Sequence, residues 1–196
     1  MERLIDERIS ARRDNVISRL AAGPLADGGI EREELVSLAV LLLMAGHDTV
    51  ARMIRLGVET LLGEPGAWAR TASETGFTAR AADELVRLYS IAADDAFRAA
   101  AADFEVGGVM IRQGDGIAPL IREANRDKAI FADADRFDPE RDNRLHLGFG
   151  FGPHTRLGRN LARAELAIGY QTLARTFPAM TIVSGAGQAA DLLVSW

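Results

Sequence analysis

Hydrophobic residues recur at helical spacing in two stretches of the N-terminal part of the chain. The first, Met1–Ala21, alternates apolar and charged positions and predicts an amphipathic helix, which the segment GPLADGG ends. The second runs from Glu31 to about Leu62 as one long helix, and it begins with glutamates, whose negative charge suits the positive end of a helix dipole. Its middle, Leu38–Ala45, is apolar on every side, which is typical of a helix buried in the centre of a fold.

The remainder of the chain mixes shorter helices with β-type segments. Helices are predicted at Pro65–Ser73, at Thr78–Tyr89 and from about Leu157 to Thr176. FEVGGVMI, RQGDG and IAPLI place β-type residues around glycine turns and predict a small antiparallel sheet, and MTIV predicts a last strand. The polar, aspartate-rich segment Ala124–Arg144 predicts an ordered meander of turns. The fold class is therefore mainly α with a small antiparallel β region.

Composition narrows the classes of function. The 196 residues, 48% of them hydrophobic, suit a single domain over residues 1–196. The net charge of -5 arises from well-mixed acidic and basic residues, so the chain lacks the basic stripe of a nucleic-acid-binding protein. The apolar run LVSLAVLLLMAG is shorter than a bilayer span, and Met1 opens on charged residues rather than on a signal peptide. A cytoplasmic protein that binds neither nucleic acid nor membrane is predicted.

The chain has no cysteine, which removes disulfides, thiolate nucleophiles and sulfur-ligated metal sites. Its three histidines are His47, His146 and His154, and none has a second histidine or a carboxylate at a metal-site spacing. No metal site is predicted. His146 is expected to be exposed to solvent in the meander region.

Four motifs follow one another in a fixed order. They are AGHDT at Ala45–Thr49, an E-x-x-R pattern at Glu84–Arg87, DRFDPER with Arg136, and a glycine-rich loop at Phe149–Gly158 that leads into a helix. In this order and at these separations the chain resembles the C-terminal half of a bacterial cytochrome P450, a family of haem-thiolate monooxygenases. The resemblance covers nearly the whole chain and implies a truncated domain in which the N-terminal half of the family fold is absent.

The resemblance also implies roles for single residues. Asp48 and Thr49 match the acid and the alcohol that relay protons during oxygen activation in the family. Two further residues match haem propionate contacts, namely Arg98 and His154. A buried ion network that holds the fold together, rather than a catalytic group, is implied for Glu84, Arg87 and Arg136.

One position departs from the family pattern. Where the family has the cysteine that ligates haem iron, this chain has Arg156. A thiolate donates electron density that favours cleavage of the O–O bond, whereas a guanidinium stays protonated and offers a metal no lone pair. We therefore expect no monooxygenation and no cofactor. The alternative is an atypical haem protein that keeps the group through another ligand such as His154.

Several functions stay open at this point. Arg156 lies where a helix begins and where free backbone N–H groups favour anions, so Arg156 and Arg159 are candidates to bind a carboxylate or phosphate; the alternative is that Arg156 turns outward to solvent. We expect a haem-free binding or auxiliary protein in a natural-product pathway. The alternatives are a non-redox enzyme of cyclisation, isomerisation or hydrolysis that uses His47, Asp48 and Thr49, and a folded chain without activity.

A protein partner is expected as well. The apolar helix segment Leu38–Ala45 would have one flank bare in a half-length fold, and a bare apolar flank of that size normally finds a partner. A homodimer or an obligate complex with another chain is predicted.

Overall fold

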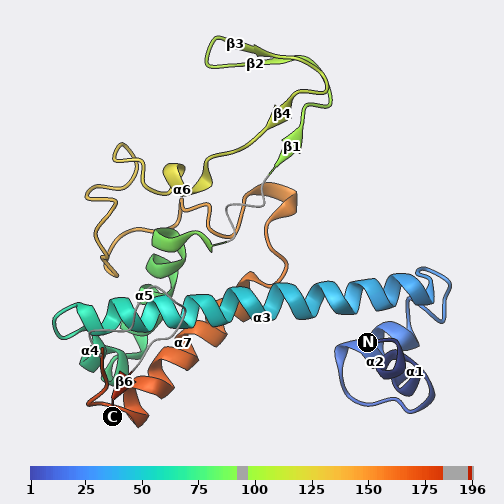
Figure 1. Cartoon of the computed structure of the whole chain (residues 1–196), viewed down its shortest axis with the longest axis horizontal. Coiled ribbons are helices and arrows are strands. Elements are labelled where there is room, and N and C mark those ends of the chain that lie inside the picture. Colours follow the sequence, from blue (N-terminus) through green and yellow to red (C-terminus); the bar gives the residue numbers. More distant parts are fainter. Residues whose placement is uncertain (92–96, 183–193, 196) are drawn as a thin grey trace. The chain divides into compact units, whose positions relative to one another are not determined.

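The computed structural model of the chain describes residues 1–91, 97–182 and 194–195 (Figure 1). The described part is mainly helical with short antiparallel strand pairs, which confirms the predicted fold class. It divides into two compact units, Met1–Asp48 and Thr49–Trp196. The long helix α3 (Arg32–Gly63) runs unbroken through the boundary, so a single domain stays a prediction.

The first unit contains two helices where one was predicted. They are α1 (Glu2–Ser10) and α2 (Val16–Ala22), so the prediction of one helix over Met1–Ala21 is wrong. Asn15 explains the break, because its side chain accepts a hydrogen bond of 2.9 Å from the backbone N–H of Ser18 and so caps α2. Both helices pack on the first turns of α3 around a small core, which comprises Ile5, Ala21, Leu35 and Ala39.

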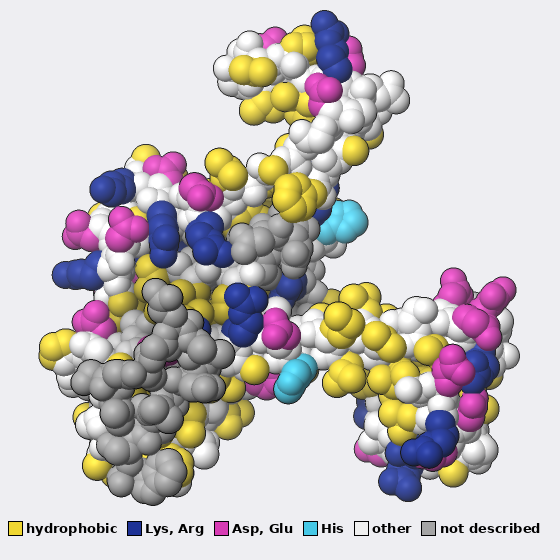
Figure 2. All heavy atoms as spheres, in the orientation of Figure 1, with side chains coloured by type: hydrophobic (Ala, Val, Ile, Leu, Met, Phe, Trp, Pro, Cys, Tyr) yellow, Lys and Arg dark blue, Asp and Glu magenta, His cyan; other side chains and the backbone are white. Residues whose placement is uncertain are grey.

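The middle of α3 is exposed rather than buried. Hydrophobic side chains lie on the surface there (Figure 2), including Leu41 and Met44, which are 61% and 67% exposed. By length and composition alone, α3 is able to cross a membrane. Its most apolar stretch of 18 residues has a mean hydropathy of 1.5, and 11% of that stretch is buried. The apolar run alone is too short for this, as predicted, but the same helix continues on both sides of the run and reaches the length of a bilayer span.

The core of the second unit lies where three helices meet the C-terminal part of α3. These are α4 (Ala67–Ser73), α5 (Thr75–Tyr89) and α7 (Arg159–Thr176), close to the predicted helices. Tyr170 is fully buried in α7 and donates a hydrogen bond of 2.6 Å to the carbonyl of Met53. A Cβ at Gly57 would overlap the Tyr170 hydroxyl, so α3 and α7 approach closely only because that residue is glycine.

Short strands complete the second unit. The hairpin of β2 (Phe104–Val106) and β3 (Val109–Ile111) turns at two glycines with positive φ, as FEVGGVMI predicts. The remaining pairs are β1 (Arg98–Ala99) with β4 (Gly116–Ile117), and β5 (Thr181–Ile182) with β6 (Val194–Ser195). In place of β structure over all of IAPLI, a helical turn α6 (Ile121–Ala124) follows β4. The 3-10 turn η2 (Gly152–His154) lies in the glycine-rich loop.

Candidate functional site

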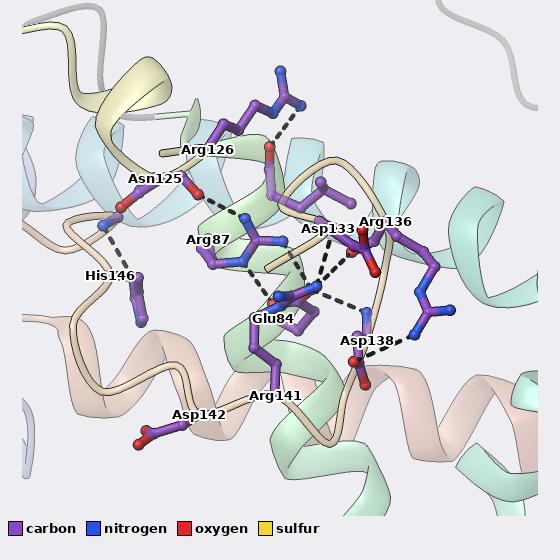
Figure 3. A network of polar contacts seen from close by, with 12 residues as sticks. Glu84, Arg87, Asn125, Arg126, Asp133, Arg136, Asp138, Arg141, Asp142 and His146 are labelled. Atoms are coloured by element: carbon purple, nitrogen blue, oxygen red, sulfur yellow. Dashed lines mark hydrogen bonds and ion pairs between the residues drawn. The ribbon is translucent and has the colours of Figure 1, made fainter. Parts of the chain in front are cut away.

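A buried ion pair connects α5 to the meander (Figure 3). Glu84 and Arg87 are both fully buried and lie one turn apart on α5. The guanidinium of Arg87 donates two hydrogen bonds to the carboxylate, of 2.7 and 2.8 Å, and a third of 2.6 Å to the carbonyl of Asn125. Because these charges neutralise each other out of reach of water, the pair is a structural element of the fold.

Asn125 extends this network, although no sequence pattern singled it out. It is fully buried, and its amide donates 2.7 Å to the hydroxyl of Ser90, at the end of α5. Its side-chain oxygen accepts a hydrogen bond of 2.7 Å from the backbone N–H of Leu147. Asn125 therefore fixes the chain just before the glycine-rich loop. One asparagine in a polar meander gives no signal from which this role could have been predicted.

Arg141, rather than Arg136, is the second arginine of the network. Its side chain is 8% exposed, and its Nε lies 3.3 Å from the Glu84 carboxylate. Arg136, predicted at this place, is 68% exposed and pairs with Asp138 at 3.6 Å. The backbone N–H of Asp138 donates 3.0 Å to Glu84, to which Arg141 also donates, three residues further along the chain. Arg136 is thus placed at the surface.

The glycine-rich loop is shaped by backbone conformations that favour glycine. Gly150 and Gly152 have φ values of +77° and +73°. The backbone N–H of Arg156 donates 2.9 Å to the carbonyl of Phe149, which closes the loop. A Cβ at Gly148 would lie 2.7 Å from the side chain of Val86, so only glycine allows the loop to approach α5 this closely.

His146 anchors the start of this loop and is half-buried, so the expectation of an exposed side chain is wrong. Its Nδ1 accepts a hydrogen bond of 3.1 Å from the backbone N–H of Gly148, and its ring lies 5.8 Å from that of Phe149. Burial lowers the pKa of His146, an effect that the nearby Asp83 carboxylate opposes.

Arg156 lines a small cavity of about 40 Å³ in the second unit. Its guanidinium makes no hydrogen bond or ion pair within the described residues, and its side chain is only partly exposed. The cavity wall is otherwise uncharged and mostly apolar, and it is formed by Thr49, Val50, Met53, Val86, Ile91, Gly148, Phe149, Ala162 and Leu166. A single cation is therefore held against an apolar surface.

The other predicted site residues are more exposed. His47 and Asp48 are exposed on α3, and Thr49 next to them lines the cavity. Arg98 is exposed in β1 and donates 2.9 Å to the carbonyl of Phe97. Two further residues of the loop region are exposed, namely His154 and Arg159. In the described ranges no side-chain hydrogen bond or ion pair joins any of these residues to Arg156.

The family model for cytochrome P450 matches residues 39–182, which is more than half of the chain. The chain belongs to the cytochrome P450 family. It is 43% identical over 185 residues to pentalenic acid synthase of Streptomyces avermitilis, covering 94% of this chain and 46% of that protein. It is 44% identical over 153 residues to 20-oxo-5-O-mycaminosyltylactone 23-monooxygenase of Streptomyces fradiae, covering 78% of this chain and 36% of that protein.

Solved P450 structures share the fold. The crystal structure of cytochrome P450 MoxA from Nonomuraea recticatena superimposes with a TM-score of 0.89 at 42% identity, over 95% of this chain and 46% of that one. The chain thus spans about half the length of the P450 proteins it matches.

Membership of this family overturns the expectation of no cofactor, because cytochromes P450 are haem-binding proteins. The residues of this chain nevertheless do not fit the family's iron ligation. The sequence contains no cysteine, and the corresponding loop position holds Arg156. No group of three or more histidine or carboxylate side chains able to hold a metal occurs among the described residues. The cavity wall is mostly apolar, and the guanidinium beside it offers iron no electron pair.

Proposed function

We propose that this P450-family chain is an auxiliary binding protein of natural-product biosynthesis that does not carry out thiolate-dependent monooxygenation. Its Arg156 cavity takes the anionic end of a largely apolar ligand. The observation that carries this proposal is the partly buried residue Arg156, which has no ion-pair partner in the described residues and lies in an otherwise uncharged wall. The relatives named pentalenic acid synthase and 20-oxo-5-O-mycaminosyltylactone 23-monooxygenase support the pathway class.

Electrostatics selects the ligand chemistry. A cation against an apolar wall is poorly hydrated, so a carboxylate or phosphate that pairs with it recovers more free energy than a neutral group does. A cavity of about 40 Å³ holds only a small group, since one water needs roughly 10–15 Å³ on the same measure. The apolar part of the ligand must then lie outside the cavity.

Haem itself belongs to this chemical class, because a porphyrin is a flat apolar molecule with two carboxylates. Family membership makes haem a leading candidate ligand. In this chain the carboxylates, and not a thiolate, would be the groups that the protein holds. His154, Arg98 and Arg159 are exposed cations or hydrogen-bond donors available for them.

Calorimetry with decanoate and decanol tests the Arg156 proposal. These two probes share the apolar chain and differ in charge. We expect decanoate to bind at least about tenfold more tightly than decanol, and Arg156→Gln to remove that difference, because a charge-assisted hydrogen bond is worth about 1.5–3 kcal/mol. Arg112→Gln, on the exposed hairpin, is the matched control. Equal binding of both probes to the unchanged chain contradicts the proposal.

A protein partner on α3 remains part of the proposal. Consecutive helical residues point about 100° apart, so the five exposed residues Val40 to Met44 face all directions around the helix axis. One flat contact covers only part of them, which favours a partner with several apolar elements, such as a second copy that exchanges helices. Solution mass tests this, because a monomer that stays soluble at high concentration contradicts it.

A cytoplasmic location is also part of the proposal, and it needs its own test because α3 has the length and composition of a membrane span. Fractionation of cells tests it, and recovery of the chain with membranes contradicts it. His47 and Asp48 are exposed, so their positions give no support to acid catalysis in an enclosed site, and no non-redox reaction is proposed.

A further inference from the structure

A second cavity, of about 250 Å³ and here called the polar cavity, lies in the same unit and is lined only by polar and charged residues. Its lining comes from α5, the end of the meander and α7, and consists of Arg80, Asp83, Arg141, Asp142, Asn143, Arg144 and Arg163. Four arginines and two aspartates make up the charged lining, and two carboxylates outside it, of Glu84 and Glu140, pair with Arg141 at 3.3 Å and with Arg80 at 2.9 Å. Arg144 lowers the pKa of Asp142 to about 2, so that carboxylate is ionised at neutral pH. Because Glu84 also pairs with Arg87, one positive charge of this group stays uncompensated.

Several guanidinium N–H groups in this polar cavity are unused. Arg163 donates through Nε to Asp83 at 2.6 Å, and its remaining nitrogens make no hydrogen bond within the described residues. Within the described residues, Arg80 donates only through Nη2, at 2.9 Å, to the carboxylate of Glu140. That carboxylate also accepts from Arg70 at 3.1 Å, but Arg70 has a second partner in Glu74 at 3.2 Å, so Glu140 balances the charge of Arg80. Free donors and one uncompensated positive charge therefore coincide in this group of arginines.

One residue of the lining, Asn143, carries an acceptor without a donor among the described residues. Oδ1 of Asn143 is shielded from solvent and has no hydrogen-bond partner in the described part of the chain. A buried carbonyl oxygen left in this state costs about 1–3 kcal/mol, which a bound molecule with a hydroxyl would recover. The cavity thus calls for a ligand that accepts several hydrogen bonds and donates at least one.

We propose that the polar cavity binds the phosphate group of a small phosphate-bearing molecule. The oxygens of phosphate match the fork of N–H donors that each guanidinium presents. Because the second pKa of a phosphate monoester is about 6, part of the population keeps a P–OH group near neutral pH, and this hydroxyl supplies the donor for Asn143 once its amide turns toward the cavity. Sulfate has comparable charge and shape but no such hydroxyl.

This site is separate from the Arg156 cavity, and ligand binding at one site does not require binding at the other. The two linings share no residue. They come close at Phe149, which lines the Arg156 cavity while the guanidinium of Arg163 lies over its ring, 5.0 Å from the centroid. Loss of phosphate binding therefore leaves the decanoate test of Arg156 interpretable.

Isothermal titration of the full chain with inorganic phosphate, at constant ionic strength, tests the proposal. We expect phosphate to bind more tightly than sulfate, and Arg80→Gln combined with Arg163→Gln to weaken it at least about tenfold. Arg112→Gln removes one positive charge from the hairpin, half of what the double variant removes, and should leave the affinity unchanged. Phosphate binding no tighter than sulfate, or unaffected by the double substitution, overturns the proposal.

A replacement double variant and a second phosphate probe complete the test. If Arg163→Gln does not fold because Asp83 loses its partner, Arg80→Gln with Arg144→Gln replaces it, since both side chains are substantially exposed. Glycerol 3-phosphate distinguishes the source of the phosphate: tighter binding than inorganic phosphate supports an organic monoester, and weaker binding supports the free ion. Failure of both to bind overturns the site.

Discussion

Two arginines, Arg87 on α5 and Arg156 in the glycine-rich loop, have opposite electrostatic surroundings. Arg87 is fully buried, and every nitrogen of its guanidinium donates to Glu84 or to the carbonyl of Asn125. Arg156 lines an apolar cavity and has no ion-pair partner within the described residues. A satisfied buried charge holds a fold, whereas an unsatisfied one at a cavity wall is available to a ligand.

The largest expected effect is on the satisfied arginine. Arg87→Leu leaves the Glu84 carboxylate buried with the longer contact to Arg141 and the backbone N–H of Asp138, so the free energy of unfolding should fall by about 3–5 kcal/mol. Urea denaturation measures this loss. Arg136→Leu is the matched control, because Arg136 is exposed and should change the stability by less than about 0.5 kcal/mol. Equal losses for both variants would contradict the assignment of the network.

The next effect concerns the asparagine that joins the network to the loop. Asn125→Ala removes the acceptor for the backbone N–H of Leu147 and the donor to Ser90, which should cost about 1–3 kcal/mol in urea denaturation. Asn160→Ala, at an exposed position of α7, serves as control. Stability that is the same for both variants would show that Asn125 is not a structural link.

Arg156 should affect binding without affecting the fold. Arg156→Gln is expected to keep the unfolding free energy within about 0.5 kcal/mol of the unchanged chain, because no ion pair is lost among the described residues. The same variant should lose the preference for decanoate. A large loss of stability would mean that Arg156 holds the loop, as Arg87 holds α5.

The smallest effect is a pH dependence at His146. Burial lowers its pKa in the folded state, so the neutral form is favoured and its contribution to stability is lost as pH falls below the ordinary value of 6.5. Protonation would also turn Nδ1 into a donor facing the N–H of Gly148. His146→Asn keeps an acceptor that does not titrate and should flatten the stability profile between pH 7 and about 5.

Exposed His154 supplies the control for this titration. His154→Asn should leave the slope of stability against pH as in the unchanged chain. If His146→Asn has the same slope as well, the hydrogen bond to Gly148 does not depend on the protonation state of His146.

Local chemistry allowed much of the fold to be predicted. The β2–β3 hairpin follows from two glycines that take positive φ, and α3, α5 and α7 follow from apolar periodicity. The break between α1 and α2 was missed, because a cap by Asn15 competes with helical periodicity. The four motifs in order were sufficient to indicate the family that the comparisons show.

Contacts between distant residues could not be predicted in the same way. Arg136 and Arg141 lie five residues apart in one polar segment, and only the turn at Asp138 decides which one reaches Glu84. The polar cavity assembles Arg80, Arg163 and the meander end from three parts of the sequence. Neither spacing nor composition records that these side chains meet.

The carbon monoxide difference spectrum of the reduced chain after haem addition tests the central claim most directly. The measurement should be made on the unchanged chain and on Arg156→Cys, which restores a thiol at the ligand position. We predict no thiolate-type band for the unchanged chain, because Arg156 has no electron pair for iron. A thiolate-like band from the chain with Arg156 in place would contradict the account.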